Sequence, residues 1–326
     1  MRNKEIDFIR GIAILSVILL HTLPLTLLEC TYYTIHIGQA VPIFLIMTLY
    51  LSFRGISKNK TSVMQFYTIS RIARVLKNVV VPFMIVVILQ ICLRIQIDGK
   101  PFEMNDLTVG WGGVGPGSYY LWVYLQFWLL IPFLYFLLDR FKIAGFFILL
   151  LICIALNVVC VRVGISDSLY RLICIRYLFL AVPAYMLLDI NKYKKPIVCI
   201  MVLASILFLV YYYKLDLSPW VLDFGWASQQ WPSYFWTMAL FMVLMAIASK
   251  MPSSNIIFRM VCWMGENSWI IFLAQMFILA QIGSGSLGFI DNSVVRFISF
   301  TIAIIILSII PAFLFDKIKV IKCHQK

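Results

Sequence analysis

Residues 4–21, KEIDFIRGIAILSVILLH, decide the fold: four charged residues precede an apolar run that ends at one imidazole. Such a run predicts a helix that crosses a lipid bilayer. Arg10 and His21 lie eleven residues apart, about 16 Å along a helix and about 20° from a whole number of turns. We therefore expect both on one face, with Arg10 near the surface and His21 deep in the bilayer. A histidine there is costly unless it faces protein or water, so His21 is either functional or a structural contact.

The rest of the chain has the composition of a polytopic membrane protein, because 63% of its residues are hydrophobic and only 13% are charged. We predict an all-α, membrane-embedded helix bundle that forms a single domain over residues 1–326. The first run is expected to be a retained helix and not a removed signal peptide. About ten transmembrane helices are expected, at 8–28, 35–53, 78–95, 120–138, 143–161, 172–188, 197–214, 232–249, 262–282 and 294–314.

The basic residues predict the topology. With the amino terminus in the cytoplasm, cytoplasmic segments hold 20 of the 27 lysines and arginines. The positive-inside rule then places both termini in the cytoplasm. The formal net charge of +13 is therefore a topology signal and does not indicate a nucleic-acid partner.

Neither cysteine nor histidine predicts a metal site. The eight cysteines form no Cys-x-x-Cys pair, and the chain has only three histidines. We expect the cysteines to act as small core residues, with no bound metal or cofactor.

Two segments on the expected outer side stand out. Residues 96–119 are rich in glycine between Gly110 and Gly117, which indicates a tight or mobile loop. Residues 215–231 carry Trp220, Trp226 and Trp231. These indoles suit either an aromatic belt at the membrane interface or stacking on sugar rings.

On the expected cytoplasmic side, Arg71 and Arg74 are three residues apart and share a helical face. They suit either anchoring to anionic lipid headgroups or bidentate binding of a phosphorylated ligand.

Three glutamines interrupt apolar runs at the expected depth of His21: Gln90, Gln126 and Gln275. This coincidence predicts a shared polar site in the outer half of the bilayer. Hydrogen bonding between helices is the alternative.

The first helix resembles the opening of the acyltransferase-3 family, integral membrane acyltransferases of which many are bacterial and modify surface glycans. The resemblance rests on Glu5–Ala13 followed by His21, on Arg71 and Arg74, on the segment from Gly115 to Tyr120, and on the region from Trp263 to Leu273. The chain departs from the family at Thr48–Tyr50, where members often have Ser-Gly-Phe, and at Gln275, where a histidine is frequent.

The resemblance implies an O-acyltransferase of the bacterial plasma (inner) membrane that uses cytoplasmic acyl-CoA, expected to be acetyl-CoA, as co-substrate. Arg10, Arg71 and Arg74 would bind its phosphates. The acceptor would be a hydroxyl of a cell-surface glycan or its lipid-linked precursor, so the activity would be O-acetylation of an envelope polysaccharide. His21 would act as general base or carry the acyl group.

The expected oxyanion or acceptor site contains Gln90, Gln126 and Gln275, with Tyr119 and Tyr120 at its outer end. Two rival functions stay open. A transporter or flippase for a glycan or lipid-linked intermediate would also have many spans and polar groups near the midplane. A membrane scaffold would tolerate the loss of His21.

Overall fold

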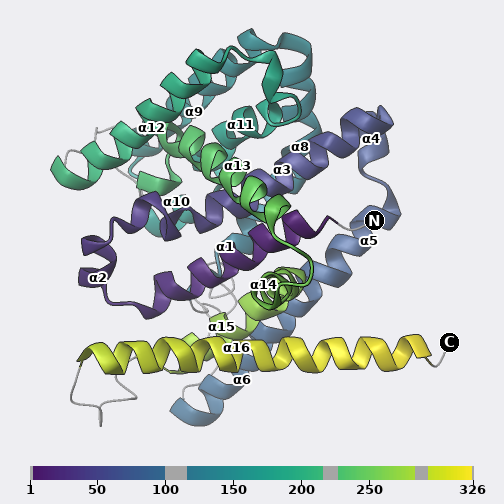
Figure 1. The fold of residues 1–326 in the computed structure, drawn as a ribbon, viewed down its shortest axis with the longest axis vertical. Helices are drawn as coiled ribbons and strands as arrows, with labels where there is room; N and C mark the ends of the chain where they lie inside the picture. Colours follow the sequence, from purple (N-terminus) through teal and green to yellow (C-terminus); the bar gives the residue numbers. More distant parts are fainter. Residues whose placement is uncertain (1–2, 100–115, 216–226, 283–292, 325–326) are drawn as a thin grey trace. The chain divides into compact units, whose positions relative to one another are not determined.

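The computed structural model describes residues 3–99, 116–215, 227–282 and 293–324. All regular structure in these ranges is helical, which confirms the predicted all-α class (Figure 1). The chain forms two compact units, each built from separate stretches of sequence. Unit 1 comprises Met1–Thr31, Leu76–Ser118 and Ile247–Lys326, and unit 2 comprises Tyr32–Val75 and Tyr119–Ala246. The single domain over 1–326 stays a prediction.

Seven helices in the described ranges are long and apolar enough to cross a membrane, or eight if one bent pair counts as a span. This confirms a multi-pass protein but not the count of about ten. All ten predicted stretches contain helix, yet three depart from a simple span. Residues 4–22 carry four charges near their start, Cys174–Met186 is too short, and the helices between Ile256 and Gln281 bend by 74°. The cytoplasmic location of both termini stays a prediction.

Unit 1 is built around its first helix. Its described elements are α1 (Lys4–Thr22), α2 (Leu25–Cys30), the π-helical turn η3 (Leu76–Val80), α6 (Val81–Asp98), α14 (Ile256–Glu266), α15 (Ser268–Gln281) and α16 (Ser293–His324). Helix α1 begins where the Asn3 side chain accepts hydrogen bonds from the amides of Glu5 and Ile6. It ends at Thr22 because Pro24 disfavours helix at Leu23. The predicted end of this span at residue 28 was therefore wrong.

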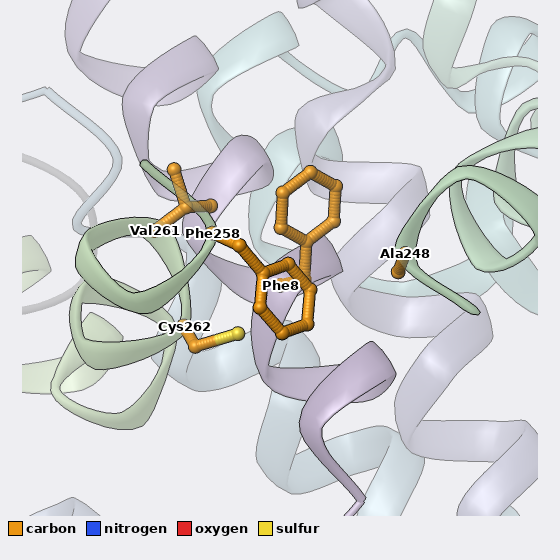
Figure 2. Packing of buried hydrophobic residues seen from close by; sticks show 5 residues of the cluster. All are labelled: Phe8, Ala248, Phe258, Val261 and Cys262. Atoms are coloured by element: carbon orange, nitrogen blue, oxygen red, sulfur yellow. The ribbon is translucent and has the colours of Figure 1, made fainter. Parts of the chain in front are cut away.

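Helix α1 packs most extensively against α14. Figure 2 shows the ring of Phe8 facing that of Phe258, and the ring centroids are 5.4 Å apart. Two glycines let the backbones approach: a Cβ on Gly11 would lie 2.0 Å from the carbonyl oxygen of Val261, and one on Gly265 would lie 1.7 Å from that of Asp7. No side chain fits at either position, as expected for small residues at a close helix crossing.

Unit 2 holds the middle of the chain. Its main described helices are α3 (Ala40–Asn59), α4 (Val63–Phe66), α5 (Ile69–Val75), α8 (Tyr120–Phe141), α9 (Ile143–Val163), α10 (Asp167–Leu172), η4 (Cys174–Leu180), α11 (Ala181–Met186), α12 (Lys195–Leu215), η7 (Ala227–Gln229), η8 (Trp231–Ser233) and most of α13 (Tyr234–Lys250). Buried polar bonds join distant parts of this unit. The Thr237 hydroxyl donates to the Gln39 side chain at 2.6 Å, and the Trp236 indole donates to the Ile35 carbonyl at 2.7 Å.

Most of the two predicted outer segments lies outside the described residues. This applies to Gly110, Gly112, Gly113 and Gly115 in the first segment, and to Trp220 and Trp226 in the second.

Candidate functional site

Arg10 and His21 lie on one unbroken helix, α1, as predicted from their spacing. Both side chains are half-buried, and the Arg10 side chain is 34% exposed. His21 occupies the last turn of the helix, so the imidazole lies at its end and not in its middle. The imidazole makes no hydrogen bond to any residue in the described ranges. The hydrogen-bonding capacity of its nitrogens is thus unused within this unit's described residues.

Arg10 is positioned by a buried carboxylate one turn earlier. Its guanidinium lies 3.7 Å from the carboxylate of Asp7, whose side chain is only 2% exposed. The Asp7 backbone also lies against α14 at Gly265, where a Cβ would be 1.7 Å from the Asp7 carbonyl oxygen. The charged end of α1 is therefore fixed by helix packing and by an ion pair at the same turn.

The bend between α14 and α15 is held by a carboxylate from the last helix. The Asn267 amide donates to the carbonyl of Trp263 at 3.1 Å and to the carboxylate of Asp316 at 3.0 Å. The Trp263 indole donates to the same carboxylate oxygen at 2.7 Å. Our sequence reasoning missed Asp316, although its signal was a single acid directly after an uncharged, mainly apolar run of 19 residues, 297–315.

Two glutamines in unit 1 are buried with no hydrogen-bond partner among the described residues. Gln90 on α6 is 5% exposed and Gln275 on α15 is 0% exposed. Neither the amide oxygen nor the amide nitrogen of either side chain is bonded within the described part of the chain. Helix α15 packs against α6 and against α1, the helix of His21. An unsatisfied buried amide costs about 1–3 kcal/mol, so these two positions call for a polar ligand or water.

Gln126, the third predicted glutamine, lies in unit 2 and differs in its bonding. Its amide nitrogen donates to the carbonyls of Trp122 at 3.1 Å and Leu172 at 2.6 Å. Its amide oxygen accepts from the backbone nitrogen of Cys174 at 3.0 Å. These bonds hold the start of η4 against α8, which is the interhelical role that was the alternative for all three glutamines.

Arg71 and Arg74 lie on helix α5 of unit 2, three residues apart as predicted. Arg71 is half-buried: it donates to the Phe66 carbonyl at 3.4 Å and lies 5.2 Å from the centre of the Phe66 ring. Arg74 is exposed. The π-helical turn Leu76–Val80 follows directly, and such turns are frequent at functional sites.

Tyr119 and Tyr120 lie at the start of α8 in unit 2. The Tyr119 hydroxyl is 3.5 Å from the Gln229 amide nitrogen, and its ring centre is 5.2 Å from the Arg176 guanidinium. The Tyr120 ring packs edge-on against Phe44. In the described ranges, no three His, Cys, Asp or Glu side chains gather to hold a metal ion.

A family model described as an acyltransferase domain, of the acyltransferase-3 type, matches residues 3–315. Neither the curated proteins nor the solved structures gave a match.

Proposed function

The chain belongs to the acyltransferase-3 family, and from that premise we propose that it moves an acyl group, expected to be acetyl, from cytoplasmic acyl-CoA to a hydroxyl of a cell-surface glycan or its lipid-linked precursor. The protein is a membrane acyltransferase with several spanning helices. The donor, the acceptor and the residue roles are the proposed part.

One observation within unit 1 carries the proposal. The helix of His21 packs against α15, and α15 and its neighbour α6 each bury a glutamine whose amide is unbonded within the described residues. An imidazole and two amides supply the groups that acyl transfer needs: one proton acceptor and donors for a developing oxyanion.

The chemistry follows from these groups. His21 takes the proton from the acceptor hydroxyl, and the oxygen attacks the thioester carbonyl. The amide of Gln275 or Gln90 donates to the carbonyl oxygen as it gains negative charge. The carbon–sulfur bond then breaks, the acyl group remains on the acceptor oxygen, and the proton leaves with the coenzyme A thiolate. Arg10 of unit 1 and the pair Arg71 and Arg74 of unit 2 each offer guanidinium forks that suit the donor's phosphates.

The direct test compares surface glycans from cells with and without the gene by mass spectrometry, together with release of coenzyme A thiol by the purified protein in lipid nanodiscs. We expect acetyl groups on the glycan only when the gene is present, and thiol release only when acceptor is supplied. A transporter would change the amount of surface glycan without acyl-CoA consumption.

We expect Arg71→Lys/Arg74→Lys to weaken acyl-CoA binding, because lysine keeps the charge but loses the fork that grips phosphate. The double alanine variant is expected to lose at least about 10- to 100-fold in affinity, the value of one hydrogen bond to a charged group. Binding of a fluorescent acyl-CoA to purified protein measures this. Lys77→Ala, which removes an exposed charge three residues further on, is the control. Unchanged affinity in the double alanine variant would assign the pair to lipid anchoring.

A second prediction contrasts two glutamines. Gln275→Leu is expected to leave the melting temperature unchanged or raise it, since the amide has no partner in the described residues. The same variant should lower the acyl-transfer rate by about 100- to 1000-fold if the amide serves the oxyanion. Gln126→Leu should instead lower stability by about 1–3 kcal/mol, because it leaves the polar groups that this amide bonds unpaired.

Melting curves and single-turnover rates of both glutamine variants distinguish a catalytic role from a structural one. If Gln275→Leu melts as low as Gln126→Leu, the Gln275 amide is a structural contact. If its acyl-transfer rate matches wild type, the oxyanion role is wrong.

A further inference from the structure

We propose that the buried guanidinium of Arg176, in unit 2, binds an oxyanion: a phosphate or carboxylate group carried by a ligand. This inference stands apart from the proposed acyl transfer, since Arg176 has no part in that chemistry and the test needs no turnover. Arg176 is one of the seven basic residues that the positive-inside argument leaves on the outer side, and the sequence analysis gave it no role.

The first observation is a buried cation without a buried counter-ion. Arg176 is 2% exposed, and no carboxylate in the described ranges forms an ion pair with it. Its Nη2 lies 3.4 Å from the carbonyl of Arg171, a long hydrogen bond, and its Nε has no partner in the part of the chain that the structure describes. Burying a guanidinium without a counter-ion costs free energy. Binding of an anion would offset this cost.

The second observation is how firmly the cation is held. Its Cζ lies 4.7 Å from the ring centre of Tyr177 and 5.2 Å from that of Tyr119. The Tyr234 hydroxyl donates to the backbone carbonyl of Arg176 at 2.6 Å, and this ring is fully buried. The two rings pack against the flat faces of the guanidinium. The N–H donors lie along its edge, so a ligand would bind there. A planar fork of this kind matches the oxygens of phosphate or carboxylate.

A third observation is that other unpartnered donors lie on neighbouring elements. The indole nitrogen of Trp231 and the amide nitrogen of Asn157 are buried without partners in the described residues. Helix α9, which carries Asn157, and turn η8, which begins with Trp231, both pack against η4, which carries Arg176. Both of these groups are N–H donors, which suits a ligand with acceptor oxygens.

The test is titration of the full-length protein in lipid nanodiscs with inorganic phosphate or with acetate, at ionic strength held constant with chloride. Tryptophan fluorescence and melting temperature report binding. We expect a saturable change and a rise in melting temperature. A response to phosphate alone identifies a phosphate-bearing ligand, and a response to acetate identifies a carboxylate. Arg176→Gln should raise the Kd by about 10- to 100-fold, as expected for a lost charged hydrogen bond.

The matched control is Arg162→Gln, which removes an exposed arginine from the end of α9 and should leave the Kd unchanged. If Arg176→Gln does not fold, Arg176→Lys replaces it, and an unchanged Kd for both anions in Arg176→Lys would overturn the proposal. The absence of any saturable response in wild-type protein would also overturn it, and would assign Arg176 to internal pairing. Asp216 and Asp223, which lie outside the described residues, would then be the first acids to replace.

Discussion

Replacing His21 by alanine is expected to lower the rate of acyl transfer by about 100- to 10,000-fold, the usual contribution of a general base. The imidazole is half-buried, lies on the same helix as Arg10, and makes no hydrogen bond within the described ranges. Its removal therefore breaks no hydrogen bond there, and stability should change little. His21→Gln should be nearly as slow, because an amide can hydrogen-bond but does not take up a proton at neutral pH. Single-turnover acyl transfer by purified variants measures the effect.

His36→Ala is the matched control, since it removes an exposed histidine from unit 2. It should retain wild-type turnover. Near-normal turnover by His21→Ala would reject the catalytic role. Loss of folded protein in His21→Ala alone would favour the structural alternative for this histidine.

Local sequence was sufficient to predict the helices, because apolar runs bounded by basic residues leave a chain few other structures in a membrane. It was not sufficient for the number of spans. The bend at Asn267 depends on Asp316, which is 49 residues away in the sequence. A hydrogen bond over that separation leaves no trace in the periodicity of either segment. The early end of α1, by contrast, was readable from Pro24.

The same limit applies to the site. The position of each residue along its helix predicted that Gln90, Gln126 and Gln275 lie at one depth in the bilayer. It could not predict which backbone groups of neighbouring helices each amide would contact. Gln126 meets the carbonyl of Leu172 and the amide of Cys174, where a short helix ends and another begins. Gln90 and Gln275 have no hydrogen-bond partner in the described chain. Tertiary structure therefore separates a structural amide from two candidate functional ones.

Arg176 shows what charge patterning alone misses. The positive-inside argument treats every arginine as a surface charge, so it scored Arg176 only as a residue on the outer side. The Arg176 guanidinium packs against Tyr177, the next residue, and against Tyr119, which is 57 positions earlier in the sequence. Only the contact with the adjacent tyrosine could be expected from the local sequence.

Gly265→Ala is expected to lower the stability of the protein more than any other glycine-to-alanine substitution in the described part of unit 1. The new Cβ would lie 1.7 Å from the carbonyl oxygen of Asp7 and 2.8 Å from the amide nitrogen of Gly11. These are backbone atoms, so no side chain can turn away and the two helices must separate. Overpacking typically costs about 1–3 kcal/mol, and rigid helix contacts lie at or above the upper end of that range. Gly265→Val should prevent accumulation of folded protein, which melting curves and size-exclusion profiles of detergent-solubilised protein will show.

The control is Gly55→Ala, at a helical glycine whose added Cβ meets nothing within 4 Å. It should be neutral or stabilising by about 0.5–1 kcal/mol, because alanine is the better helix former. The damage from Gly265→Ala should extend to the proposed donor-binding residue Arg10, since the displaced carbonyl belongs to Asp7, whose carboxylate pairs with Arg10. Any folded Gly265→Ala protein is therefore expected to show a raised KM for acyl-CoA. Wild-type melting and wild-type KM in Gly265→Ala would contradict the close crossing of α1 and α14 on which the position of Arg10 depends.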